Sequence, residues 1–172
     1  MTIFGDSVAA SILYVPAAQS YLHHRYDVKL DLAVCRRLVA PSCVYQGRQP
    51  STALEAIRAR RGHLGRTVVM DVGYSDDAST FRPDLDRIMR TLRSEGVRTV
   101  VWTTFRENGN SSYHLMNGVM RNAHRRWPGL RVADWNAWSQ GHAWFASDGL
   151  HLNPAGAIGL AHLIAKTVGT GR

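Results

Sequence analysis

Two observations in the sequence predict an α/β fold built around one parallel sheet. Five short apolar segments with strand character alternate along the chain with segments that have the apolar spacing of helices. No two strand segments are joined by a hairpin turn, which leaves crossover connections and therefore parallel strands. Such a sheet is covered by helices on both faces. We therefore expect a three-layer α/β/α sandwich in which residues 1–172 form a single domain.

The strand segments share β-branched or apolar side chains and are bounded by polar or glycine-containing stretches. The first begins almost at Met1 and ends before Gly5, and the third is a continuous apolar run of the kind found in buried parallel strands. The five segments are residues 1–4, 28–34, 66–72, 97–103 and 130–135. Because they alternate with helices in this order, we expect the flavodoxin-like arrangement of a five-stranded parallel sheet.

The helix boundaries are predicted from residues that begin or end helices. Residues 7–25 have rough helical spacing but are interrupted by Pro16, where the helix kinks or restarts. Thr52 and Glu55 have the spacing of a capping box, and Asn153 precedes Pro154 as a cap does. The remaining predicted helices are 52–62, 83–96, 113–126 and 153–169.

Composition limits the classes of function. The net charge is +8, with arginines clustered at 36–37, 58–61 and 125–126. These clusters are scattered along the chain and no nucleic-acid motif accompanies them, so we expect solvated helix faces with a general attraction to polyanions and no specific nucleic-acid partner. No apolar run approaches the roughly 20 residues of a membrane-spanning helix.

The only cysteines, Cys35 and Cys43, lie close together in a short loop that contains Pro41. This setting favours a local disulfide over two buried thiols. A bridge in turn favours a secreted or cell-envelope protein, with an export signal that this chain does not include. A cytoplasmic location is the alternative, because the first strand begins almost at Met1.

A candidate nucleophile follows the first strand, in the segment Gly5-Asp6-Ser7. The carboxyl edge of a parallel sheet is where such folds bind their ligands, and Gly5 allows a tight turn from strand to helix. Alone, the segment is also ordinary turn chemistry, with Asp6 or Ser7 capping the next helix. Ser7 becomes a candidate only if a base lies near it in the fold.

The base is predicted at the other end of the chain, in Asp148-Gly149-Leu150-His151. An aspartate and a histidine three residues apart on a turn can face the same way, so that Asp148 orients the imidazole of His151 while its other nitrogen reaches a serine hydroxyl. The chain order serine, aspartate, histidine is one of several that this chemistry uses.

Taken together, Gly5-Asp6-Ser7 and Asp148-x-x-His151 resemble the motifs of the GDSL/SGNH hydrolase superfamily over essentially the whole chain. The resemblance implies a catalytic triad of Ser7, His151 and Asp148 on a flavodoxin-like fold. It also implies an oxyanion hole made of the Ser7 N–H, a glycine N–H after the second strand, and an asparagine side chain in a Gly-x-Asn-Asp motif after the third.

Two oxyanion positions fit that pattern loosely. Gly47 follows the second strand and is the expected glycine donor, although it is also an ordinary turn residue. The segment Gly73-Tyr74-Ser75-Asp76 has serine where the family has asparagine. Ser75 offers one hydroxyl donor on a shorter side chain, so we expect direct or water-mediated contact, or altered activity.

Four aromatic residues near the Asp148–His151 turn form an aromatic wall for an acyl chain or sugar ring, or else serve packing: Trp135, Trp138, Trp144 and Phe145. A metal site of His142 with Asp148 and His151 lacks any fixed ligand spacing, so we expect no metal.

The predicted function is that of a monomeric serine esterase or deacylase that needs no cofactor. The alternatives are an acyltransferase that uses the same acyl-enzyme and a catalytically weak module that binds glycans.

Overall fold

A computed structural model describes residues 1–170 of the chain. Five strands form one sheet in the order β2-β1-β3-β4-β5, and every neighbouring pair is parallel. The strands are β1 (Thr2–Gly5), β2 (Lys29–Leu32), β3 (Thr67–Asp71), β4 (Thr99–Thr103) and β5 (Leu130–Ala133). The predicted α/β fold with a five-stranded parallel sheet is therefore confirmed.

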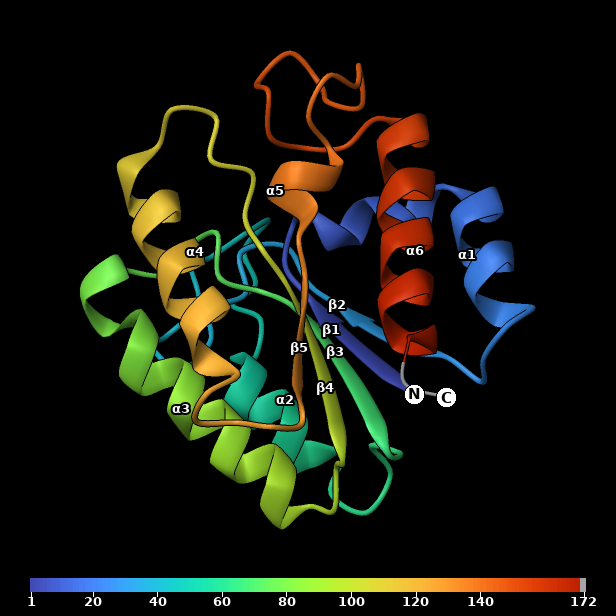
Figure 1. The fold of residues 1–172 in the computed structure, drawn as a ribbon. Helices are drawn as coiled ribbons and strands as arrows, with labels where there is room; N and C mark the ends of the chain where they lie inside the picture. Colours follow the sequence, from blue (N-terminus) through green and yellow to red (C-terminus); the bar gives the residue numbers. More distant parts are fainter. Residues whose placement is uncertain (171–172) are drawn as a thin grey trace.

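Helices cover both faces of the sheet, which completes the three layers (Figure 1). One layer contains the 3₁₀ helix η1 (Ala9–Tyr14), α1 (Pro16–His23) and α6 (Pro154–Gly169), and the other contains α2 (Ala53–Ala59), α3 (Ala78–Ser94) and α4 (Ser111–Ala123). The short α5 (Trp135–Trp138) follows β5 at the carboxyl edge of the sheet. Within residues 1–170, no helix is both long enough and apolar enough to cross a bilayer.

The central strands are buried on both faces, as their continuous apolar runs predict. Ile3 and Phe4 of β1 and Val68 and Val69 of β3 have no exposed surface. Burial of this kind stabilises a fold by about 25 cal/mol for each square ångström of apolar surface removed from water. The core therefore fixes the directions of β1 and β3, and with them the points at which both strands end.

The predicted start of the third long helix is wrong. The sequence places it at Pro83, whereas α3 begins at Ala78 and continues through Pro83. A proline in this place removes one backbone hydrogen bond of the helix. The first turn is held nevertheless by Phe81, which is fully buried and packs edge-on against Trp102 and Phe105. Tertiary packing here outweighs the local signal of the proline.

Other boundaries differ from the prediction by a few residues. The first helix restarts at Pro16, so that η1 and α1 are separate, and α4 begins after Asn110, whose side chain accepts hydrogen bonds from the next helix turn. The predicted last strand extends to residue 135, but the chain turns at Asp134 and α5 begins. The capping box of Thr52 and Glu55 is present as predicted.

Candidate active site

The carboxyl ends of β1, β2 and β3 lie next to one another in the sheet. β1 is the central strand of these three, and the strand order reverses between β1 and β3, which is where open α/β sheets bind ligands. Ser7 follows β1, Cys35 follows β2 and Ser75 follows β3. The fold thus gathers three segments that are distant in sequence around the end of β1.

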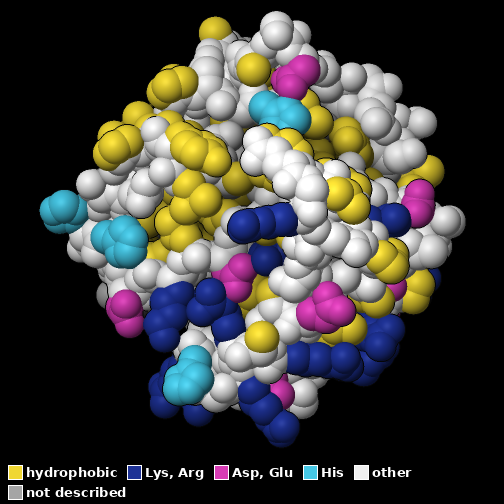
Figure 2. Space-filling view, turned by 180° about the vertical axis from the view of Figure 1, so that it is seen from behind, with side chains coloured by type: hydrophobic (Ala, Val, Ile, Leu, Met, Phe, Trp, Pro, Cys, Tyr) yellow, Lys and Arg dark blue, Asp and Glu magenta, His cyan; other side chains and the backbone are white. Residues whose placement is uncertain are grey.

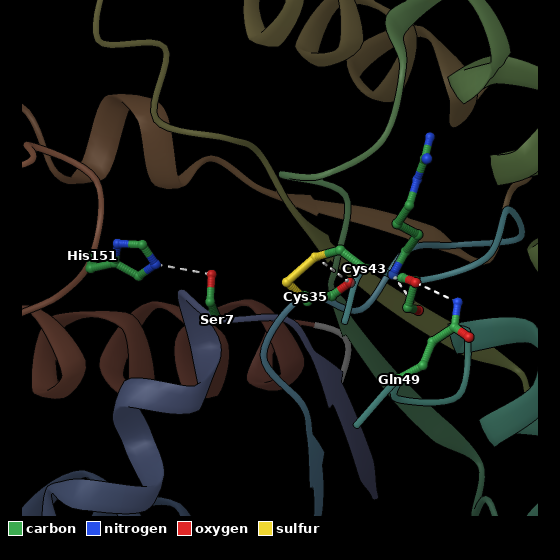
Figure 3. The surroundings of a disulfide bond; sticks show 7 residues. Ser7, Cys35, Cys43, Gln49 and His151 are labelled. Atoms are coloured by element: carbon green, nitrogen blue, oxygen red, sulfur yellow. Dashed lines mark hydrogen bonds between the residues drawn. A yellow bond between two sulfur atoms is a disulfide. The ribbon is translucent and has the colours of Figure 1, made fainter. Parts of the chain in front are cut away.

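Ser7 and His151 meet across this edge. The Nε2 atom of His151 lies 3.0 Å from the Oγ atom of Ser7, and its Nδ1 atom lies 2.6 Å from Oδ2 of Asp148. Figure 3 shows the imidazole of His151 on one side of Ser7 and the Cys35–Cys43 disulfide on the other. The three side chains that the sequence selected from the two ends of the chain therefore form one continuous chain of hydrogen bonds.

The turn that carries His151 is stabilised by Asp148 itself. Its Oδ1 atom accepts hydrogen bonds from the N–H groups of Leu150 at 2.9 Å and His151 at 3.0 Å. The turn also requires Gly149, which has a φ of 69° and a Cβ position only 2.7 Å from the Asn108 side chain. The hydrogen bond with His151, together with these N–H groups, lowers the pKa of Asp148 to about 2. Asp148 is therefore ionised at neutral pH, as a group that orients an imidazole must be.

The turn that carries Ser7 is held by the buried carboxyl group of Asp6. Its Oδ1 atom accepts the N–H of Val8 at 3.1 Å, and Oδ2 accepts those of Gly73 at 3.0 Å and Tyr74 at 3.1 Å. Asp6 thereby joins the end of β1 to the segment after β3. Burial raises its pKa to about 6, although the three N–H groups favour the charged form.

A second buried carboxyl group lies beneath Asp6. Asp71 ends β3, and its Oδ1 atom accepts a hydrogen bond from the Thr103 hydroxyl at 2.5 Å, while Oδ2 has no partner among the described residues. Burial, followed by the negative charge of Asp6, raises the pKa of Asp71 to about 7. Because Asp6 accepts three N–H groups and Asp71 only one hydroxyl, Asp71 is the carboxyl group of the two that binds a proton more readily.

A pocket of about 510 Å³ opens beside Ser7. It is lined by Ser7, Ala10, Ser11, Tyr14, Val34, Cys35, Tyr45, Ser75 and His151. Ser75 is exposed, and no hydrogen bond ties its hydroxyl to residues 1–170, so the hydroxyl can turn toward a ligand. The structure thus brings Ser75 to the pocket.

The structure does not bring Gly47 to this pocket. Gly47 lies in an exposed turn between Tyr45 and Arg48, whose backbone groups bond each other at 2.9 and 3.0 Å. Its φ of 74° and the open space around its Cβ position suit an ordinary turn glycine. The position after β2 that lines the pocket is Cys35 instead.

Sequence reasoning missed Cys35 because it considered only a glycine for this place. Cys35 has a φ of 69°, a left-handed backbone that non-glycine residues rarely adopt. In the part of the chain that the structure describes, the N–H groups of Ser7 and Cys35 donate to no protein group. The predicted disulfide is present, with the Cα atoms of Cys35 and Cys43 5.3 Å apart.

The loop around Cys35 is fixed by its neighbours as well as by the bridge. The Arg36 guanidinium bonds Asp31 and the Ser51 carbonyl, and the Leu38 N–H donates to the buried carboxylate of Asp76. Asp76 follows Ser75 directly, so the loops after β2 and β3 are joined beneath the pocket. Burial raises the pKa of Asp76 to about 6.

The predicted aromatic wall is not part of this pocket. Trp135 is buried and stacks on Trp144. The His142 ring also stacks on Trp144, with the two ring centroids 3.8 Å apart. Phe145 packs beneath the Arg106 guanidinium. These residues support the loop that carries His151 rather than line the pocket. Within residues 1–170, no group of three or more His, Cys, Asp or Glu side chains is placed to hold a metal ion.

The fold is similar to those of several solved esterases. The chain aligns with a protein of Agrobacterium tumefaciens named as an arylesterase at a TM-score of 0.73 and 12% identity, with 97% of each chain covered. It aligns with a carbohydrate acetylesterase family member of Sinorhizobium meliloti at a TM-score of 0.68 and 13% identity, covering 97% of this chain and 96% of the other. It aligns with the psychrotrophic esterase EstA of a Pseudoalteromonas species at a TM-score of 0.67 and 12% identity, with the same coverage of both chains. Neither a protein-family model nor a curated protein matches the sequence. These similarities confirm the fold expected for the GDSL/SGNH superfamily.

Proposed function

We propose that the protein is a serine esterase in which Ser7 forms the acyl-enzyme. The observation that carries this proposal is the hydrogen-bonded chain from Ser7 through His151 to Asp148, at the edge of the sheet where such folds bind ligands. The esterase names of the structural neighbours agree with it. The bridge between Cys35 and Cys43 fits an oxidising compartment, so we include export or a cell-envelope location in the proposal.

In the proposed reaction the Ser7 hydroxyl attacks the ester carbonyl while Nε2 of His151 accepts its proton. Asp148 stabilises the imidazolium that forms. The tetrahedral intermediate collapses when His151 returns this proton to the departing alcohol. Water then attacks the acyl-enzyme with His151 again as the base, which releases the acid and restores the Ser7 hydroxyl.

Negative charge on the former carbonyl oxygen must be met by fixed donors. The N–H groups of Ser7 and Cys35 and the hydroxyl of Ser75 lack protein acceptors among residues 1–170, and these residues follow β1, β2 and β3 at the pocket. We therefore assign the oxyanion hole to these three residues, with Cys35 in the place that the sequence assigned to Gly47. The backbone donors are held by the strands before them, whereas the serine hydroxyl must be oriented by the ligand.

A fluorophosphonate probe tests the proposal directly, because it labels an activated serine covalently. The choice of a phosphonate follows the Pseudoalteromonas structure, which is described as inhibited by monoethylphosphonate. We expect one adduct, on Ser7, and loss of both labelling and ester hydrolysis in Ser7→Ala. Hydrolysis that survives in Ser7→Ala, or an adduct on another serine, would contradict the assignment. Product analysis with a sugar acceptor would distinguish hydrolysis from acyl transfer.

A further inference from the structure

The pocket beside Ser7 continues into a second hollow of about 620 Å³. The two share Ala10, Tyr14, Val34 and Tyr45 as wall residues, so they form one groove. We call this the Tyr14–Tyr45 groove. It leads from the Ser7 hydroxyl between η1 and the loop after β2, and Arg48 and Pro50 are among the residues that line its second hollow. An acetyl group would fill only a small part of this space.

Exposed apolar side chains are concentrated along this groove. Within residues 1–170, five large apolar side chains are exposed, and four of them stand on the two segments that flank the groove. These are Leu13 (41% exposed), Tyr14 (78%), Val44 (66%) and Tyr45 (47%). Figure 2 shows hydrophobic side chains gathered over the upper half of the molecule, the half in which the strands end. A cluster of this kind on an otherwise charged surface marks a binding site.

Apart from the two tyrosines, the polar residues of the second hollow are amides and one guanidinium. Gln46, Arg48 and Gln49 line the outer hollow, and no acidic side chain lines either part. Arg48 forms no ion pair with residues 1–170. The groove therefore combines two exposed tyrosine rings with neutral and positive hydrogen-bonding groups.

We propose that the Tyr14–Tyr45 groove binds the saccharide part of a carbohydrate ester, with a small acyl group at Ser7. This proposal rests on the serine esterase function proposed above. A sugar ring offers an apolar face that packs on an exposed tyrosine and hydroxyls that bond amide and guanidinium groups. A long acyl chain would instead gain most from an enclosed apolar channel. The open tyrosines and the Gln46–Gln49 segment favour the sugar.

The test compares two substrates, acetylated xylo-oligosaccharides and ethyl acetate, each assayed by acid release. The measured quantity is the ratio of kcat/KM for the first to kcat/KM for the second. We expect Tyr14→Ala/Tyr45→Ala to lower this ratio at least tenfold, mainly through KM for the oligosaccharide. Leu115→Ala is the matched control, because Leu115 is the fifth exposed apolar residue and lies on α4, outside the groove.

Three results would overturn the proposal. The ratio could stay constant in the tyrosine variant, it could fall equally in Leu115→Ala, or the variant could lose activity selectively on ethyl octanoate, which would assign the groove to an acyl chain. Each of these results leaves the serine esterase function intact. Failure of that function is recognised separately, by absence of the Ser7 adduct and of hydrolysis of every ester in the parent protein.

Discussion

The two sides of the Ser7–His151 hydrogen bond are built differently. On the serine side, Asp6 is 1% exposed and bonds backbone groups that lie 67 and 68 residues away in the chain. On the histidine side, the Asp148 side chain is 48% exposed and, among residues 1–170, bonds only Leu150 and His151. The nucleophile is therefore positioned by the tertiary fold, and the base by a local turn.

Because of this difference, we expect substitutions at the two aspartates to affect folding and activity to different extents. A change at Asp6 disturbs buried groups shared by two strand ends, so it must affect folding as well as activity. A change at Asp148 leaves the core untouched and affects the imidazole and the exposed turn that carries it. Variants at Asp6 should therefore lower both the free energy of unfolding and the activity, whereas variants at Asp148 should lower mainly the activity.

The largest effect on activity is expected from Asp148→Ala. Without the carboxylate, His151 loses both its orientation and the charge that stabilises the imidazolium, so kcat should fall by roughly 10³–10⁴. The free energy of unfolding should change by no more than about 1 kcal/mol, because the site is exposed. Steady-state kinetics and urea unfolding measure the two quantities. A large loss of stability would show that the turn is not local.

Asp6→Ala, unlike Asp148→Ala, should strongly lower the free energy of unfolding. Three buried N–H groups lose their acceptor, and each unsatisfied group costs about 1–3 kcal/mol, so we expect a loss on the order of 3 kcal/mol or more. Urea unfolding measures this loss, and Asp27→Ala, at an exposed aspartate outside the site, is the matched control. Unchanged stability in Asp6→Ala would contradict the assignment of the serine side to the tertiary fold.

Ser75→Ala should lower kcat by about ten- to a hundredfold with little change in KM, because the hydroxyl contact is made only in the transition state. This corresponds to about 1.4–2.7 kcal/mol. Ser75→Asn should equal or exceed the parent enzyme if the pocket accommodates the larger amide. A kcat for Ser75→Ala equal to that of the parent would remove Ser75 from the oxyanion hole.

The role of Cys35 is tested by two variants that both lack the disulfide. In Cys35→Gly/Cys43→Ser, the glycine at position 35 adopts a φ near 69° without strain. In Cys35→Ala/Cys43→Ser, the same backbone angle at alanine costs roughly 1 kcal/mol of conformational energy. Both should lose about 2–3 kcal/mol of stability with the bridge. We expect a kcat about fivefold lower for the alanine variant than for the glycine variant. Equal values, with a loss in Gly47→Ala, would return the donor to Gly47.

Local signals explain what the sequence could predict. Short segments are enough to recognise the alternating strands and helices and the capping box at Thr52. The same is true of the motifs Gly5-Asp6-Ser7 and Asp148-x-x-His151. Cys35 was missed as a donor because no residue type predicts its left-handed backbone, and the loop around it is held by contacts of Arg36 with Ser51 and of Leu38 with Asp76, which lie farther along the chain. The start of α3 was missed for the same reason, since burial of Phe81 is a property of the fold.

The buried pair of Asp6 and Asp71 should make stability depend on pH. Because the folded-state pKa values, about 6 and about 7, lie above the ordinary aspartate pKa of 3.8, the folded protein binds protons more tightly than the unfolded chain. The stability from these carboxyl groups is therefore fully present below about pH 4 and declines as pH rises toward 7. Asp71→Asn keeps an acceptor for the Thr103 hydroxyl but removes the titrating group and its repulsion of Asp6. Urea unfolding between pH 4 and 8 should show a smaller decline of the free energy of unfolding in Asp71→Asn than in the parent. Parallel profiles would show that Asp71 does not titrate in this range.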